Sequence, residues 1–298
     1  MRTVYLGTSA FAAEVLERLA ASPHRPALVV TRPDRPAGRG RRMQAPPVAS
    51  AAHALGLPVA QPDDVNEEGA RARIAAVAPE VVVVCAFGAL IRAELLAVHD
   101  MLNVHPSLLP RWRGAAPIER AIMAGDAQTG VAIMRVTAGL DSGPVCLVER
   151  EPIRDDDTFG TLSVRLAALG GELLVRALDE RPACAEQPED GVTYAEKIAA
   201  EDRLLDPLTS SAVQVARTVR ALSPHVGARL ALAGGSEYLG VWAAQLADAA
   251  ASEPGTLGNE GGRLLLTTAD GALELTVVQP PGKRAMPAAD YLRGHAVS

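Results

Sequence analysis

The stretch Val81-Val82-Val83-Val84-Cys85 consists of five consecutive apolar residues, four of which are β-branched. A continuous apolar run of this length is typical of a parallel strand that is buried on both faces of its sheet. Shorter apolar runs precede it at Val4–Leu6 and Ala27–Val30, and another follows at Met101–Val104. We predict that these four segments are strands of one parallel sheet.

A helical pattern separates the first two of these strands. Apolar residues recur at three- and four-residue spacing from Phe11 to Leu19, which predicts an amphipathic helix over residues 12–20. Strands that alternate with helices predict an α/β fold with a doubly wound, Rossmann-like sheet, whose ligands bind at the carboxyl ends of the strands. The first turn, Gly7 to Phe11, lacks the G-x-G-x-x-G pattern of dinucleotide-binding proteins, so a Rossmann dehydrogenase is disfavoured.

The second half of the chain has a different pattern. A long amphipathic helix is predicted over residues 158–178 and another over 212–222, with a polar, proline-rich segment at 182–191 between them. Apolar and polar residues then alternate from Leu273 to Val277, and Asp270-Gly271 supplies a hairpin turn. We therefore predict three parts, which are an α/β domain over 1–187, a linker over 188–206 and a C-terminal OB-like β-barrel over 207–298.

The composition is that of an ordinary globular chain. Its 298 residues are 48% hydrophobic and 21% charged with a net charge of −6, which excludes a mostly disordered protein. No segment reaches the ~18 apolar residues of a membrane span, and the N-terminus has no apolar signal region. The three cysteines, Cys85, Cys146 and Cys184, are odd in number and far apart. We expect free thiols in a cytoplasmic protein that has no membrane partner.

The stretch from Asn103 to Pro110, Asn-Val-His-Pro-Ser-Leu-Leu-Pro, is the most informative for function. Asn103 and His105 are two residues apart at the end of a predicted strand, so their side chains lie on the same face. A carboxamide beside an imidazole can stabilise an oxyanion and move a proton. Spacing alone leaves a second interpretation open, in which both are hydrogen-bonded polar residues in a turn fixed by Pro106 and Pro110.

Two further segments could carry chemistry. Asp141 lies in Gly-Leu-Asp-Ser-Gly-Pro, where the glycines allow close approach to a ligand, although an Asp before Ser-Gly is usually a turn residue. Residues 32–42 contain five arginines and one acid, and their prolines and glycines predict an irregular, exposed loop. Such a loop could reach phosphates or could be a solvated charge run, and the local sequence leaves both interpretations open.

Together these segments resemble the folate-dependent formyltransferases over nearly the whole chain. The most specific match is N-V-H-P-S-L-L-P-R-W-R-G-A-A-P-I, from Asn103 to Ile118. The other matching segments are R-P-D-R-P-A-G-R-G-R-R-M from Arg32, A-G-D-A-Q-T-G-V from Ala124, G-L-D-S-G from Gly139, T-Y-A-E-K-I from Thr193 and Q-P-P-G-K-R-A-M from Gln279.

The resemblance implies an enzyme in which a primary amine attacks the formyl carbon of the co-substrate 10-formyltetrahydrofolate. Carried over to the matching positions, Asn103 and His105 stabilise the oxyanion, while Asp141 holds His105 and helps to move the proton. No metal is expected. The resemblance places the folate against Ser107, Leu108, Leu109 and Pro110, with its pterin near Gly88, Ala89, Leu90 and Ile91.

Three of these segments indicate a particular kind of member within this family, one that formylates methionine on initiator tRNA in translation initiation. They are the arginine-rich loop, W-R-G-A-A-P-I and T-Y-A-E-K-I. We expect a monomer, and we expect its C-terminal domain to help to dock the tRNA. The resemblance also implies tRNA contacts from the loop, with Arg39 as the central arginine of the set Arg35, Arg39, Arg41 and Arg42.

Two rival functions share parts of this pattern. An enzyme that formylates an amino-sugar nucleotide or another small amine would keep Asn103, His105 and Asp141 but would not need the arginine-rich loop. A tRNA-binding module without activity would not need those three residues, which are intact. One departure from the family concerns residues 201–298, which hold eight Lys or Arg and ten Asp or Glu where the family is often basic.

Overall fold

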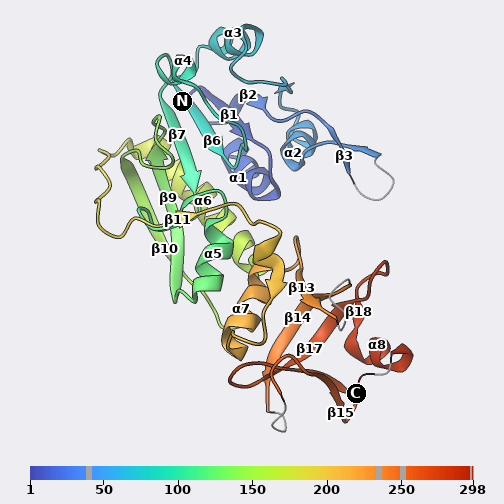
Figure 1. Cartoon of the computed structure of the whole chain (residues 1–298). Coiled ribbons are helices and arrows are strands. Elements are labelled where there is room, and N and C mark those ends of the chain that lie inside the picture. Colours follow the sequence, from blue (N-terminus) through green and yellow to red (C-terminus); the bar gives the residue numbers. More distant parts are fainter. Residues whose placement is uncertain (38–41, 233–236, 249–252, 296, 298) are drawn as a thin grey trace. The chain divides into compact units, whose positions relative to one another are not determined.

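The computed structural model describes residues 1–37, 42–232, 237–248, 253–295 and 297, and its contacts divide the chain into two compact units (Figure 1). Unit 1 comprises Met1–Pro117, Gln128–Pro152 and Ser163–Ala195. Unit 2 comprises Ile118–Ala127, Ile153–Leu162 and Glu196–Ser298. The units therefore interleave along the sequence, unlike the contiguous domains predicted with boundaries at 187 and 206.

Unit 1 is built on a seven-stranded sheet with the order β10-β9-β7-β6-β1-β2-β5. The four predicted strands are present and pair in parallel, and most of their apolar side chains are buried on the two faces of the sheet. The parallel strands are β1 (Thr3–Gly7), β2 (Pro26–Val30), β5 (Val59–Ala60), β6 (Val81–Cys85) and β7 (Met101–His105), while β9 (Gln128–Arg135) and β10 (Val145–Pro152) are antiparallel.

Helices cover both faces of this sheet, as a doubly wound fold requires. On one face Ile74 and Leu95 belong to the apolar cluster that includes Val4 and Val82. On the other face Gly170 lies against Val104, since an added Cβ there would be 2.9 Å from that side chain. The helices are α1 (Ala10–Ala20), α2 (Pro47–Ala54), α3 (Glu68–Val77), α4 (Ala93–Leu96) and α6 (Phe159–Glu180).

The arginine-rich segment is more regular than the sequence suggested. β3 (Arg35–Ala37) pairs with β4 (Arg42–Gln44) as an antiparallel ribbon, although an irregular loop was predicted there. Pro36 is compatible with the ribbon because a two-stranded ribbon has only edge strands, where a missing N–H is tolerated. Arg39 and Arg41 lie outside the described residues.

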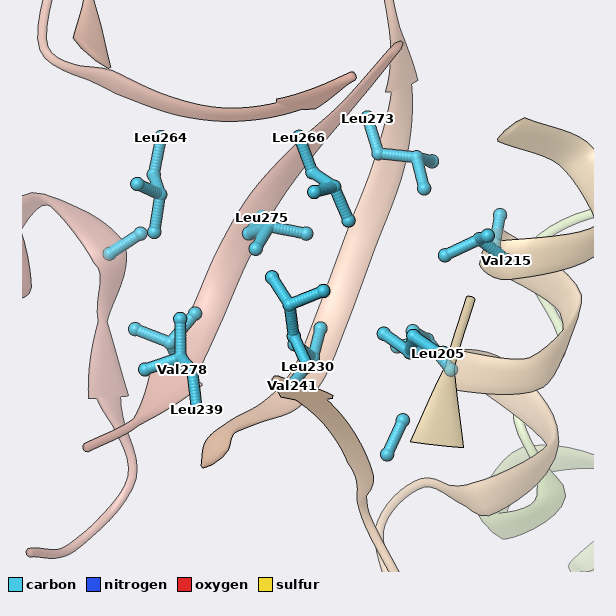
Figure 2. Packing of buried hydrophobic residues seen from close by; sticks show 14 of the residues in the cluster. Leu205, Val215, Leu230, Leu239, Val241, Leu264, Leu266, Leu273, Leu275 and Val278 are labelled. Atoms are coloured by element: carbon cyan, nitrogen blue, oxygen red, sulfur yellow. The ribbon is translucent and has the colours of Figure 1, made fainter. Parts of the chain in front are cut away.

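Unit 2 contains the predicted C-terminal β-structure as a curled sheet with the order β12-β13-β14-β17-β16-β15 (Figure 1). A further strand, β18, pairs with β17. The strands are β12 (Leu204–Leu205), β13 (Ala228–Ala231), β14 (Tyr238–Ala247), β15 (Leu257–Glu260), β16 (Arg263–Thr267), β17 (Ala272–Gln279) and β18 (Met286–Pro287). Figure 2 shows the leucine and valine side chains that fill the inside of this sheet. The expectation of an OB-like β-domain is confirmed.

Helix α7 (Ala212–Leu222) closes this core and has the bounds that the sequence predicted. It begins at Ser211, which forms a capping box with Gln214, and its apolar face is buried because residues such as Val215 point into the sheet (Figure 2). Asp270 of the predicted hairpin turn accepts a hydrogen bond from the Ala212 N–H at 2.8 Å. The remaining helices of unit 2 are α5 (Pro117–Ala124), the 3₁₀ turn η1 (Glu201–Arg203) and α8 (Ala288–Gly294).

The prediction of three free thiols is wrong, because Cys146 and Cys184 form a disulfide. Val145 and Ala185 pair as an antiparallel bridge, and this pairing sets the neighbouring cysteines side by side. The two cysteines are 38 residues apart, so their spacing gave no sign of the bridge. Cys85 is free and buried. Within the described ranges, no helix has the length and apolar character needed to cross a membrane.

Candidate active site

The carboxyl ends of β1 and β6 mark the point where strand order reverses in the sheet of unit 1. From β1 the chain adds β2 and β5 on one side, whereas β6 and β7 extend the sheet on the other side. Ligands of open α/β sheets bind beside such a switch point. Here the Thr8 hydroxyl, just after β1, donates to the carbonyl of Phe87, just after β6, at 2.7 Å.

The structure brings Asn103, His105 and Asp141 together at this edge. The first two lie at the end of β7, and Asp141 comes from the loop between β9 and β10. Nδ2 of Asn103 is 3.4 Å from Oδ1 of Asp141, and Nδ1 of His105 is 3.7 Å from Oδ2. The His105 side chain is 4% exposed and that of Asp141 is 18% exposed, so the carboxylate lies between a buried imidazole and solvent.

The ring of His105 has a defined orientation. Its Nε2 lies 2.9 Å from the carbonyl oxygen of Trp112, which can only accept a hydrogen bond. Nε2 therefore carries a proton, and Nδ1 is the ring nitrogen that can gain or lose one. Because Nδ1 is the atom that faces Asp141, the pair can hold a proton at this position.

The loop that carries Asp141 is fixed through its backbone. Asp141 has a positive φ of 45°, and its Oδ2 accepts a hydrogen bond from the Gly114 N–H at 2.9 Å. The side-chain amide of Gln187 donates to the carbonyls of both Asp141 and Gly143 at 2.8 Å. Gly143 has no room for a side chain, since an added Cβ would overlap the carbonyl oxygen of Arg135. Gly143, the second glycine of the Gly139–Gly143 motif, is thus required by packing.

The segment from Ser107 to Pro110 leaves the same edge of the sheet. Ser107 is buried, and its hydroxyl donates to the carbonyl of Arg111 at 2.7 Å. Leu108, Leu109 and Pro110 are partly buried. This segment follows His105 closely in the sequence and carries apolar side chains that are partly exposed.

Residues Gly88 to Ile91 follow β6 and form a second loop at this edge. The carbonyl of Gly88 accepts from Nη1 of Arg32 at 2.7 Å, and that of Leu90 accepts from Nδ2 of Asn66 at 2.9 Å. Ala89 and Ile91 pack against the core, while Leu90 is 76% exposed. The loop is thus tethered through its carbonyls and exposes an apolar side chain.

The predicted tRNA-binding arginines are only partly described. Arg35 and Arg42 lie on β3 and β4, and both are exposed. Arg32 precedes this ribbon by three residues and is the residue that bonds to Gly88, so the base of the ribbon is attached to the second loop of the site. Within the part of the chain that the structure describes, no group of three His, Cys, Asp or Glu side chains could hold a metal ion.

Sequence reasoning missed the residues that support this cluster. The Trp112 carbonyl accepts a hydrogen bond from His105, and the Gly114 N–H donates one to Asp141. Gln187 donates to the carbonyl of Asp141, and Thr193 accepts from the N–H of Trp112. Trp112 and Gly114 lie within the most specific sequence match, and Thr193 begins another. Gln187 had no such signal, because it lies in the polar, proline-rich segment 182–191, outside every segment that matches the family.

Fold and site define a Rossmann-like α/β protein with an Asn–His–Asp cluster at the ligand-binding edge of its sheet. The chain belongs to the formyl transferase family, whose N-terminal model matches residues 1–178 and whose C-terminal domain model matches residues 197–296. It is 47% identical to the methionyl-tRNA formyltransferase of Halorhodospira halophila, over 98% of this chain and 96% of that protein.

Two solved structures share the fold. The methionyl-tRNA formyltransferase from Clostridium thermocellum has a TM-score of 0.61 at 14% identity, over 83% of this chain and 94% of that one. HypX from Aquifex aeolicus in complex with tetrahydrofolic acid has a TM-score of 0.68 at 18% identity, over 98% of this chain. The chain spans about half the length of HypX, covering 47% of it.

Proposed function

We propose that the chain transfers the formyl group of 10-formyltetrahydrofolate to the amino group of methionine on initiator tRNA. The observation that carries this proposal is the likeness to a methionyl-tRNA formyltransferase over both units of the chain. An amino-sugar formyltransferase would share the Asn–His–Asp cluster, but the curated relatives that match the whole chain have the tRNA activity in their names. Because translation takes place in the cytoplasm, the proposal includes a cytoplasmic location, and we expect a monomer.

The two loops at the sheet edge suit a folate. Leu90 on one loop and Leu108 and Leu109 on the other are apolar, and the two loops follow β6 and β7, which are adjacent strands of the sheet. A flat heteroaromatic ring binds through apolar contacts together with a few backbone hydrogen bonds. HypX, which shares the fold, binds tetrahydrofolic acid. When bound, the donor supplies the formyl carbon that the amine attacks.

The Asn–His–Asp cluster matches the charges that develop in this reaction. When a neutral amine attacks the formyl carbon, the carbonyl oxygen becomes negative and the nitrogen carries one proton too many. Nδ2 of Asn103 is held only loosely by Asp141, at 3.4 Å, and is the donor for the oxyanion. Nδ1 of His105, beside Asp141, is the site that receives the proton and passes it to the departing folate nitrogen.

Formyl transfer to a defined acceptor tests this proposal. The purified chain would be given 10-formyltetrahydrofolate with charged initiator tRNA and an amino-sugar nucleotide as competing acceptor. We expect formylmethionine on the tRNA and an unmodified sugar. Preferential formylation of the sugar would overturn the proposal in favour of the small-amine function.

A further inference from the structure

The segment that follows α6 contacts both loops that hold the Asn–His–Asp cluster. Gln187 lies at its centre and uses every hydrogen-bonding position of its amide. Its two N–H groups donate to the carbonyls of Asp141 and Gly143, both at 2.8 Å. Its carbonyl accepts from Nε and Nη2 of Arg113, at 3.0 and 2.8 Å. A guanidinium only donates and a carbonyl only accepts, so these partners fix which end of the amide is the nitrogen.

The partners of Gln187 are the two pieces of backbone that set the position of the Asp141 carboxylate. One is the Asp141 loop itself. The other is the segment from Trp112 to Gly114, which accepts the His105 Nε2–H through Trp112 and donates the Gly114 N–H to Oδ2 of Asp141. Gln187 therefore joins the backbone that carries the carboxylate to the backbone that orients the imidazole.

The conformation of Asp141 explains why it requires such support. Its φ of 45° lies in the left-handed region, which is unfavourable for most residues that carry a side chain. Such a conformation persists only where the surroundings enforce it. The hydrogen bond from Gln187 acts on the carbonyl of this same residue.

We infer that Gln187 is a positioning residue for formyl transfer, with Arg113 holding its amide in the required orientation. The inference rests on the proposed function, because it assigns Gln187 the task of keeping Asp141 beside His105. A displacement of about 1 Å in a reacting group can lower a rate by about a hundredfold. Loss of the amide should therefore lower kcat more than it lowers binding.

The segment has other attachments that keep it in place without Gln187. The Cys146–Cys184 disulfide and the Val145–Ala185 bridge hold it on one side. On the other side β11 (Tyr194–Ala195) pairs in parallel with β8 (Arg113–Gly114). Thr193 also accepts the Trp112 N–H at 2.9 Å. These attachments predict that a Gln187 variant folds.

The test compares Gln187→Met with the parent in the full chain. We expect kcat to fall about tenfold to a hundredfold, while KM for folate and for charged tRNA changes less than about twofold. Gln214→Met is the matched control, since this glutamine accepts the Ser211 N–H in a helix cap of unit 2. It should keep the parent kcat. A parent kcat for Gln187→Met would overturn the inference.

A second variant and a double-mutant cycle separate positioning from a general structural role. Gln187→Glu keeps a partner for Arg113 but places a carboxylate against two carbonyls, and we expect a similar loss of kcat. In an Asp141→Ala background, Gln187→Met should lower kcat little further, because Gln187 acts through Asp141. A full additional loss would overturn the inference. A parent kcat for Asp141→Ala alone would instead remove Asp141 from the mechanism, and the proposed mechanism and the inference would fall together.

Discussion

The proposed role of His105 depends on which of its two ring nitrogens can exchange a proton. The Trp112 carbonyl engages Nε2, so Nδ1, which faces Asp141, is the nitrogen that remains for this exchange. Removing one oxyanion donor, here Asn103, typically costs about 2.7–4 kcal/mol of barrier. Proton transfer by a positioned side chain, here His105 held by Asp141, typically contributes about 10²–10⁴-fold in rate. We expect His105→Ala, Asn103→Ala and Asp141→Ala each to lower turnover by about a hundredfold or more, with the fold intact.

Turnover at saturating substrates and circular dichroism of each variant would check this prediction. Asn259→Ala is a suitable control, because this asparagine accepts the Gly262 N–H in a hairpin of unit 2. Near-parent turnover for His105→Ala would contradict the assignment.

The cysteines differ in reactivity because of their surroundings. Burial raises the pKa of the Cys85 thiol to about 12, so it stays protonated and does not act as a nucleophile at pH 8. We expect iodoacetamide to modify no cysteine of the folded protein, two after reduction of the folded protein, and all three after reduction and unfolding together. Mass spectrometry of the three samples would count the modified residues. Labelling of Cys146 without a reductant would show that the disulfide is absent.

At the scale of elements, an ion pair joins α5 to the turn η1. Arg120 donates from Nη1 and Nη2 to the two carboxylate oxygens of Asp202, both at 2.8 Å. These hydrogen bonds hold the pKa of Asp202 below its ordinary value. A carboxyl whose pKa is lower in the folded state stabilises the protein above its unfolded pKa, and this stability is lost as the pH falls through the folded pKa.

Asp202→Asn should therefore lower the free energy of unfolding at pH 7 by about 1 kcal/mol, given the partial exposure of the pair. The difference from the parent should shrink as the pH falls below about 4, because the Asp202 carboxyl then takes up a proton in the unfolded chain before it does so in the folded protein. Urea unfolding at pH 7 and pH 3 measures both values. An equal difference at the two pH values would exclude the ion pair as its cause.

Elements with local periodicity were predictable from the sequence, whereas contacts between distant segments were not. Val81–Cys85 and the helix Ala212–Leu222 form where their apolar patterns indicated, because burial of a repeated face decides such elements. The disulfide depends on a bridge between residues 145 and 185. Asn103 and His105 were identified by their two-residue spacing, but the contact of Gln187 with Asp141 spans 46 residues and has no local pattern.

At the scale of the whole molecule, the boundary after α6 can be tested with fragments. The sequence analysis predicted an α/β domain that ends at residue 187 and contains all the residues expected to contact the folate. Thr193 and β11, which contact the segment around Trp112, lie beyond that end and within unit 1. We expect a fragment of residues 1–195 to bind folate more tightly than one of residues 1–187. Calorimetric titration of both fragments would decide this, and equal affinities would show that the added residues do not support the site.

The proposed recognition of tRNA should depend mainly on the arginine-rich segment. Residues 201–298 have more acidic than basic side chains, so the arginines at 35, 39, 41 and 42 should supply a large share of the affinity. Binding constants of nucleic-acid complexes fall linearly with salt concentration on a log–log plot, and each phosphate contact that is lost makes this slope shallower by about 0.7–0.9. Arg39→Ala should therefore weaken transfer to tRNA and flatten this slope, and a fourfold Arg→Ala variant should do so more strongly.

Folate binding should be unchanged in both variants, because the residues proposed to contact the folate lie on other segments. Arg293→Ala, which removes an exposed arginine of α8, is the control for a general loss of charge. Transfer to charged tRNA and folate affinity would be measured in the same preparations across salt concentrations. If the fourfold variant formylates tRNA as well as the parent, the loop is a solvated charge run. The arginines would then no longer distinguish a tRNA substrate from an amino sugar.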